Sequence, residues 1–284
     1  MSTRLALYDR VAEETASVVI RKYSTSFGLA SRLLGVGVRQ HVENIYALVR
    51  VADEIVDGPA TEAGLDTVEA GRALNLLEKD TENAMENGFS ANLIVHAFAL
   101  TAREVGFGAE YTAPFFDSMR ADLTETVHDQ ASFDTYVYGS AEVVGLMCLR
   151  AFVHGESVDE EALIPGARAL GAAFQKVNFL RDLSADFETL GRSYFPGVSV
   201  DSFTEEDKNR LLDDIDNDLA TSAAVVPLLP RSSRRAVALA QSLFAELAVR
   251  LRATPATELV RARVRVPNPV KARLAISAAL GGRP

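Results

Sequence analysis

Residues that favour helices dominate this chain from end to end, and this pattern restricts its fold more than any other feature. Ala, Leu, Glu and Arg are frequent in almost every segment. No segment shows the sustained alternation of apolar and polar residues that marks a half-buried strand. We therefore expect an all-α protein in which helices pack against helices.

Clusters of Gly, Pro, Asn and Ser divide this helical pattern into separate helices. Between them we expect about ten helices, the longest near residues 38–57, 132–154 and 159–188. No connection is long enough to mark a domain boundary, so we expect a single domain over residues 1–284. The clusters lie at residues 35–37, 58–64, 87–90, 106–108, 155–158, 191–202, 227–233 and 267–269.

The overall charge and the cysteine count exclude several classes of protein. The formal net charge is -10, which makes the chain a poor candidate for binding nucleic acid through its phosphates. Cys148 is the only cysteine, so no intramolecular disulfide can form, as is typical of a reducing cytoplasm. The start of the chain has no apolar run like a signal peptide, and apolar stretches such as 236–240 are too short to span a bilayer. We expect a cytoplasmic protein that is soluble or at most peripheral to a membrane.

Two pairs of aspartates carry the functional signal. Asp53 and Asp57 are four residues apart near the end of the first long helix, and Asp182 and Asp186 repeat this spacing in another. On a helix, residues four apart lie on one face with their Cβ atoms about 5–6 Å from each other. An isolated pair of this kind is usually a solvated acidic face.

Polar companions on the same helix faces argue against that interpretation. Arg50 and Tyr46 precede the first pair by one and two turns, Gln175 and Asn178 accompany the second, and Arg181 flanks it. Both helices are otherwise strongly apolar. A narrow polar stripe on an apolar helix indicates a polar channel inside the protein.

Carboxylate pairs that face each other across a channel are suited to magnesium. Mg²⁺ is usually held by a few carboxylates, several waters and the phosphate oxygens of a substrate. Arg50 and Arg181 could contact phosphate oxygens directly. Such a site would ionise a diphosphate ester, and the resulting carbocation would need a dry, aromatic-lined pocket.

Five blocks in this order along the chain make it resemble the squalene/phytoene synthase family. They cover most of the chain, and the order of all five is far more specific than any one block. The blocks are Tyr23 to Phe27, Tyr46 to Asp57, Met119 to Leu123, Tyr136 to Met147, and Gln175 to Asp186 with its continuation to Pro196.

The resemblance implies an isoprenoid synthase fold, a bundle of antiparallel helices around a central cavity with the two aspartate pairs facing each other at its mouth. It implies Mg²⁺, or Mn²⁺, at Asp53, Asp57, Asp182 and Asp186, with Asn178 assisting. Arg50, Gln175 and Arg181 would contact the diphosphates or the reacting centre. The remaining roles it implies fall on Ser24 and Ser26 near a diphosphate, Phe27, Val144, Gly145 and Leu146 along the prenyl chain, Tyr136 beside the cations, Tyr46 and Tyr194 at the substrate and Arg263 near the second diphosphate.

The activity that the resemblance implies is head-to-head condensation of two prenyl diphosphates, with geranylgeranyl diphosphate giving phytoene. The alternatives are a squalene or dehydrosqualene synthase that uses farnesyl diphosphate, and a non-catalytic member that acts in assembly. Retention of all four aspartates argues against the last. We expect a monomer with peripheral membrane contact for product release, and weaker magnesium affinity because Ala185 stands where many relatives have Glu.

Overall fold

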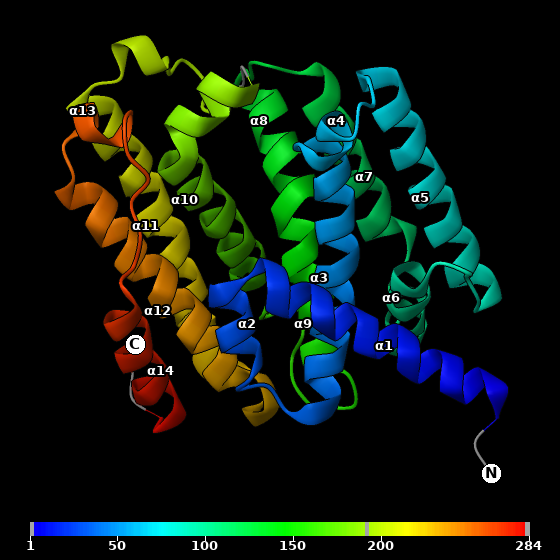
Figure 1. The fold of residues 1–284 in the computed structure, drawn as a ribbon. Helices are drawn as coiled ribbons and strands as arrows, with labels where there is room; N and C mark the ends of the chain where they lie inside the picture. The colour runs from blue at the N-terminus through cyan, green and yellow to red at the C-terminus, as the bar shows by residue number, and fades with distance from the viewer. Residues whose placement is uncertain (1–2, 191–192, 282–284) are drawn as a thin grey trace.

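The computed structural model describes residues 3–190 and 193–281, and the side chains of residues 184–190 lie outside that description. Within these ranges the chain forms helices and no strand, apart from one isolated bridge between Val127 and Ser193. The expected all-α class is therefore confirmed. Figure 1 shows the helices packed side by side as a bundle, with α1 crossing in front of it.

Fourteen α-helices are found in the described residues, more than the sequence predicted, because short helices form within or beside the breaker clusters. They are α1 (Arg4–Tyr23), α2 (Thr25–Ser31), α3 (Val36–Val56), α4 (Pro59–Glu62), α5 (Thr67–Asn87), α6 (Leu93–Val105), α7 (Ala109–Thr124), α8 (Gln130–Val137), α9 (Val143–Val153), α10 (Ile164–Leu190), α11 (Glu205–Val225), α12 (Arg231–Ala253), α13 (Ala256–Leu259) and α14 (Asn268–Ala279), with the π-helix η1 (Tyr138–Glu142) and the 3₁₀ helices η2 (Val200–Ser202) and η3 (Val226–Leu228).

The helix ends follow local chemistry. Asp66 caps α5 and Thr204 caps α11, each in a reciprocal capping box with the acidic residue three positions later. Gly88 ends α5 and Gly106 ends α6 in the left-handed conformation, both with φ 79°. The helix expected from residue 159 starts only at Ile164, because Pro165 fits the first turn of a helix but not its interior.

The central helix runs without a break from α8 through η1 to α9 and is long and apolar enough to cross a membrane. Of its most apolar stretch, however, 61% is buried inside the bundle, as in the core helix of a soluble protein. Its π-helical turn at Tyr138–Glu142 inserts one wider turn in mid-helix. Turns of this kind are often found at functional sites.

Glycines let this central helix approach its neighbours closely. A Cβ on Gly171 would lie 2.5 Å from the carbonyl oxygen of Ala141, and one on Gly145 would lie 2.5 Å from that of Ala167. Both contacts are with backbone, which cannot move aside as a flexible side chain would. Close packing of α9 on α10 therefore requires glycine at these positions.

Gly171→Ala is expected to lower the free energy of unfolding by about 1–3 kcal/mol, because the added methyl forces the two backbones apart. Gly37→Ala is the matched control, since a Cβ there meets nothing within 4 Å and alanine favours the helix. Urea unfolding of both variants measures the difference. Equal stability of the Gly171 variant and the wild type would contradict the close packing.

Candidate active site

A deep apolar cavity runs through the bundle between α3, α9, α10 and α12. It encloses about 280 Å³. Its polar lining includes Tyr46 of α3 and Gln175 and Asn178 of α10, with the smaller side chains of Ser31, Ser140 and Ser222 elsewhere. The opposite end is closed by apolar residues, among them Phe152, Leu163 and Leu229. The cavity therefore has a polar end and a hydrophobic floor.

Helical spacing explains which residues of the central helix line this cavity. Ser140, Val144 and Cys148 lie four apart on one face of η1 and α9, and Gly145 lies beside them. The expected lining residues Val144 and Gly145 do face the cavity. The expectation for Leu146 was wrong: it is buried but not part of the lining, because each residue turns about 100° from the last.

The first aspartate pair ends the stripe on α3, above Tyr46. Asp53 lies in the last turn, and Asp57 is the residue that caps the helix, its backbone N–H bonded to the Asp53 carbonyl at 2.9 Å. Arg50 donates to Asp53 Oδ2 at 2.6 Å and also pairs with Glu54. Its guanidinium lies 4.7 Å from the centre of the Tyr23 ring. The arginine is thus held at the mouth of the cavity by two carboxylates and one aromatic ring.

Electrostatics make Asp53 unusual for a carboxylic acid. Burial raises its pKa to about 7, and the neighbouring charge of Asp57 adds to this effect. Arg50 lowers the pKa, and the more distant charge of Asp122 raises it further. The pair carries negative charge that nearby arginine only partly offsets, so a bound cation would be strongly favoured here.

The second pair lies on α10, one turn beyond Asn178. Arg181 donates to both oxygens of Asp182, with Nε to Oδ1 at 3.0 Å and Nη2 to Oδ2 at 2.5 Å. Arg263, from the segment that follows α13, adds an ion pair from Nε to Oδ1 at 2.7 Å. Asp186 and Ala185 lie in the part of α10 whose side chains fall outside the described residues.

The position of Arg263 was predicted only from resemblance. The sequence placed it near the second diphosphate, and the structure places it on Asp182, 81 residues away in the chain. The Arg263 side chain is 51% exposed, whereas that of Asp182 is 20% exposed. A second ligand at this mouth would therefore meet Arg263 directly.

Tyr136 and Tyr194 do not line the cavity; both are buried and donate to the same carboxylate. The Tyr136 hydroxyl lies 2.9 and 2.8 Å from the two oxygens of Asp122, and the Tyr194 hydroxyl lies 3.0 Å from one of them. Burial and the negative charge of Asp122 raise the pKa of Tyr136 well above its usual value. The charge of Asp122 raises the pKa of Asp53, and the charge of Asp57 raises the pKa of Tyr136. The hydrogen-bonded group of Tyr136, Asp122 and Tyr194 therefore lies beside the first aspartate pair.

The amino-terminal block lies against the same cavity. Phe27 lines it, with ring centroids 5.4 Å from Phe174 and 5.6 Å from Phe244. Ser24 caps α2 by accepting from the Phe27 N–H at 3.0 Å and hydrogen-bonds to Tyr46. Ser26 is half-buried and does not line the cavity. Of this block, Phe27 thus faces the apolar space, and Ser24 steadies the polar end.

The carboxylates near the polar end of the cavity could hold a divalent cation as pairs, not as a cluster of three or more. No three carboxylate, imidazole or thiol groups among the described side chains lie close enough to hold one ion. The Asp53–Asp57 pair nonetheless fits, because its mutual repulsion raises the pKa of Asp53 and a cation would relieve it. Magnesium needs only one or two protein carboxylates when phosphate oxygens and water complete its shell.

Two residues of this site were not predicted from the sequence. Asp122 is 8% exposed and anchors both tyrosines, and Glu54 shares Arg50 with Asp53. The signal for Asp122 was present, since it is the acidic residue of the block Met119 to Leu123 that supports the family resemblance. Glu54 gave no such signal, because an acidic residue beside an aspartate is ordinary in a helix.

Comparison with solved structures shows the same fold. A dehydrosqualene synthase bound to a ligand matches with a TM-score of 0.79 at 21% identity, over 96% of this chain and 97% of that one. A squalene synthase from Alicyclobacillus acidocaldarius matches with a TM-score of 0.74 at 19% identity, over 87% of this chain and 95% of that one. The isoprenoid synthase fold expected from the sequence is therefore confirmed.

Sequence comparison identifies relatives that are named as phytoene or diapophytoene synthases. The chain is 29% identical to a 15-cis-phytoene synthase of Paracoccus sp. (strain N81106 / MBIC 01143), over 66% of this chain and 60% of that protein. It is 27% identical to a phytoene synthase of Pseudescherichia vulneris, over 81% of this chain and 79% of that protein. It is also 29% identical to a 4,4'-diapophytoene synthase of Staphylococcus haemolyticus (strain JCSC1435), over 65% of this chain and 62% of that protein.

The alignment with the Paracoccus protein thus spans about three fifths of that relative's length. The model of the family described as "Squalene/phytoene synthase" matches residues 20–269, which include every block of the sequence resemblance. The chain belongs to the squalene/phytoene synthase family.

Proposed function

We propose that this protein condenses two prenyl diphosphates head to head, and that its preferred substrate is geranylgeranyl diphosphate, which gives phytoene for carotenoid biosynthesis. One observation carries this proposal. Tyr46 of α3 and Asn178 of α10 line an apolar cavity, and Asp53 and Asp182 follow them on the same helix faces, so an apolar chain and a charged diphosphate could be accommodated side by side.

The mouth residues would bind the diphosphate and hold it in place. Magnesium or manganese would be held by Asp53 and Asp57 on α3 and by Asn178, Asp182 and Asp186 on α10. The bound ion would withdraw charge from the departing diphosphate as a Lewis acid. Arg50 and Arg181 are already directed to carboxylates in this region and would move onto phosphate oxygens, which they bind with the same fork geometry.

The cavity would protect the cations formed on loss of diphosphate. The double bond of the second substrate would attack the first cation, and loss of a proton to the released diphosphate would close the ring and give a cyclopropyl diphosphate. Its ionisation, rearrangement and loss of a proton to the departing diphosphate would complete the product. The chain's own contribution is an apolar wall that excludes water, with the Phe27 and Phe174 rings facing that space.

Tyr136 would influence the site without touching the substrate. Its hydroxyl is engaged by Asp122, so we propose that it shapes the electrostatic field beside the first aspartate pair. The same applies to Tyr194, whose ring stacks on Phe179 with centroids 3.9 Å apart. We further propose a monomer of one domain, located in the cytoplasm.

Substrate length separates this proposal from its alternatives. The lining of α10 extends from Gly166 to Asn178, roughly 18 Å of helix, long enough to lie along a prenyl chain. The names of two relatives favour phytoene, whereas a dehydrosqualene synthase shares the fold. A non-catalytic member acting in assembly is disfavoured because the sequence retains all four aspartates.

Geranylgeranyl diphosphate is expected to be converted to phytoene at a higher kcat/KM than farnesyl diphosphate is converted to its product. Purified protein is incubated with each substrate separately and with Mg²⁺, and the extracted hydrocarbons are identified by mass. Exclusive use of farnesyl diphosphate would refute this choice and favour the dehydrosqualene or squalene alternative. No hydrocarbon from either would favour the non-catalytic alternative.

A further inference from the structure

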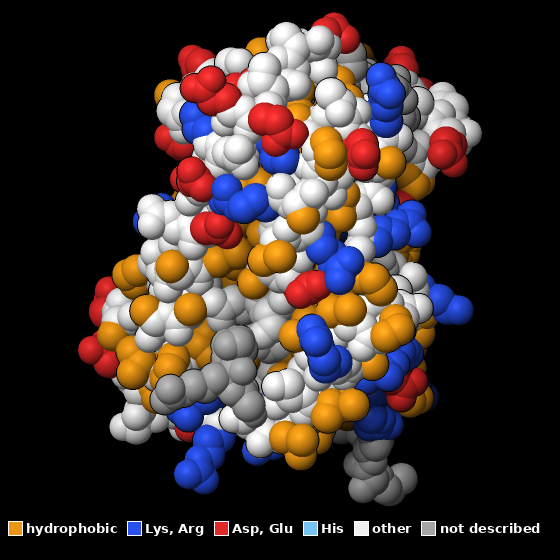
Figure 2. Space-filling view, turned by 90° about the vertical axis from the view of Figure 1, so that its left-hand side faces the viewer, with side chains coloured by type: hydrophobic (Ala, Val, Ile, Leu, Met, Phe, Trp, Pro, Cys, Tyr) orange, Lys and Arg blue, Asp and Glu red, His pale blue; other side chains and the backbone are white. Residues whose placement is uncertain are grey.

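Ser140 places a polar group inside the apolar cavity. It lies in the π-helical turn η1, lines the cavity and is only 9% exposed. Among the described residues, its Oγ has no hydrogen-bond partner. Figure 2 shows the charged side chains of one face spread over the surface, where water can solvate them. A buried hydroxyl without a partner lowers stability instead, so its presence in this wall needs an explanation.

The hydrogen bonds around the π-helical turn leave this hydroxyl without its usual partner. Serine and threonine hydroxyls within helices often donate to the carbonyl four residues earlier. Those of Thr135 and Ser242 do so at 2.9 and 2.7 Å. For Ser140 that carbonyl belongs to Tyr136, and it accepts instead from Ser118 Oγ of α7 at 3.1 Å. The Ser140 hydroxyl is therefore available to a ligand in the cavity.

Close packing against α7 holds this turn in place. A Cβ on Gly139, the residue before Ser140, would overlap the Pro114 carbonyl and the Ser118 hydroxyl. The backbone of the turn thus lies directly on α7 and has no room to move toward it. The position of the Ser140 hydroxyl is fixed before any ligand binds, which is the condition for a preorganised electrostatic contact.

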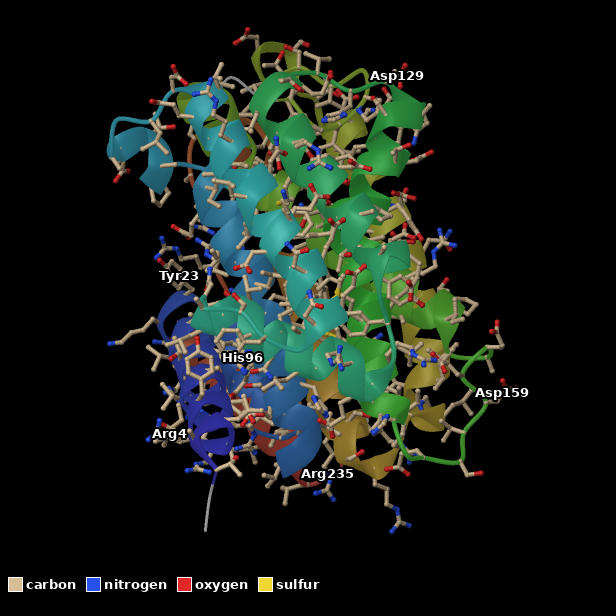
Figure 3. All side chains as sticks on the ribbon, turned by 90° about the vertical axis from the view of Figure 1, so that its right-hand side faces the viewer. Arg4, Tyr23, His96, Asp129, Asp159 and Arg235 are labelled. Atoms are coloured by element: carbon tan, nitrogen blue, oxygen red, sulfur yellow. The ribbon has the colours of Figure 1, made fainter. Side chains whose placement is uncertain are left out.

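The central helix and α10 run in opposite directions along the cavity. Figure 3 shows Asp129, which caps α8, near the upper end of the bundle, and Asp159, which precedes α10, lower down. The Phe133 ring of α8 lies 6.4 Å from the Phe179 ring in the second half of α10. Residues further along the central helix therefore lie beside residues earlier in α10.

This register gives the depth of Ser140 in the cavity. The carbonyl of its neighbour Ala141 packs on Gly171, one turn of α10 before Gln175. Ser140 is thus roughly 5 Å along the helix axis from the level of Gln175. Phe152, at the closed end, is roughly 18 Å further along the central helix. The hydroxyl therefore lies close below the polar end, beside the first carbons of a chain whose diphosphate is held there.

We propose that Ser140 is a catalytic residue whose hydroxyl oxygen lies against the prenyl cation formed when diphosphate leaves. This inference rests on the proposed function, because the cation arises only in prenyl transfer. A hydroxyl oxygen carries partial negative charge, and apolar surroundings screen its attraction for a cation only weakly. No bond is made or broken at the oxygen and no proton moves, so the contribution is purely electrostatic.

A pair of ligands that differ only in charge tests this contact directly. A geranylgeranyl chain that ends in trimethylammonium mimics the cation without an N–H donor, and its isostere with carbon in place of nitrogen is neutral. Both are titrated calorimetrically with Mg²⁺ and inorganic diphosphate present. Ser140→Ala is expected to weaken binding of the ammonium about threefold or more and to leave binding of the neutral isostere unchanged. Equal effects on the two ligands, or none on either, would overturn the proposal.

Turnover of two variants of equal shape separates the hydroxyl from packing. Ser140→Thr keeps the hydroxyl and Ser140→Val replaces it with a methyl group. With geranylgeranyl diphosphate and Mg²⁺, the valine variant is expected to have a kcat at least about tenfold below that of the threonine variant, at similar KM. Ser242→Ala removes a helical hydroxyl outside the cavity lining and should retain wild-type kcat. Equal kcat in the threonine and valine variants would refute a catalytic hydroxyl.

Melting temperature without ligand is a readout that does not depend on the reaction. Ser140→Ala removes a buried hydroxyl that has no protein partner, so its melting temperature should rise above that of the wild type. Ser242→Ala loses a hydrogen bond and should show no such rise. A lower melting temperature for Ser140→Ala would contradict the unpaired hydroxyl and overturn the proposal. Wild-type protein that forms no hydrocarbon would refute the proposed function, whereas normal synthesis by Ser140→Val would refute this inference alone.

Discussion

Asp53→Asn and Asp182→Asn are each expected to lower turnover at least about 10²-fold, because each removes a charge that would position metal and diphosphate at the mouth. The amide keeps the shape of the side chain, so the cavity itself should be intact. Initial rates with geranylgeranyl diphosphate and Mg²⁺ measure the effect. Glu82→Gln, an exposed carboxylate on α5, is the control and should retain wild-type activity.

The two variants should differ in stability without ligand. The folded state raises the pKa of Asp53 from 3.8 to about 7, so keeping this group ionised costs folding free energy above pH 7. The cost is relieved as the pH falls through 7. Asp53→Asn should therefore raise the melting temperature at pH 8, with an advantage that shrinks toward pH 5.

Asp182→Asn should have the opposite effect, because it leaves Arg181 and Arg263 without their shared carboxylate. Its melting temperature should fall below that of the wild type at both pH values. Near wild-type activity in both variants would show instead that these helices merely present a solvated acidic face.

Removal of divalent cations is expected to abolish turnover. Rates in EDTA should fall to background and return when excess Mg²⁺ or Mn²⁺ is added, while the helical circular dichroism is unchanged. Because Asp53 binds a proton near pH 7, the Mg²⁺ concentration for half-maximal rate should rise as the pH falls below 7. Full turnover in EDTA would exclude a metal clamp at the aspartate pairs.

The fold and the mouth of the site were largely predictable because they depend on local spacing. Asp53 and Arg50, like Asn178 and Asp182, share a helix face through the period of the helix alone. The cavity lining on α9 follows the same period. Leu146, which was wrongly expected in the lining, lies one residue after Gly145 and is therefore turned away from the cavity.

What could not be predicted depends on contacts between distant segments. Arg263 reaches Asp182 across 81 residues, and Tyr194 reaches Asp122 across 72, and no local pattern specifies such partners. The π-helical turn at Tyr138–Glu142 depends on packing against α7 and α10.

The central claim is that the aspartate mouth joins two prenyl chains rather than hydrolysing one. It is tested most directly by measuring the diphosphate released per apolar product formed from geranylgeranyl diphosphate in the presence of Mg²⁺. The account predicts two diphosphates for each hydrocarbon, and a hydrocarbon with twice the carbon number of the substrate chain. One diphosphate released for each prenyl alcohol, with no doubled chain, would contradict it.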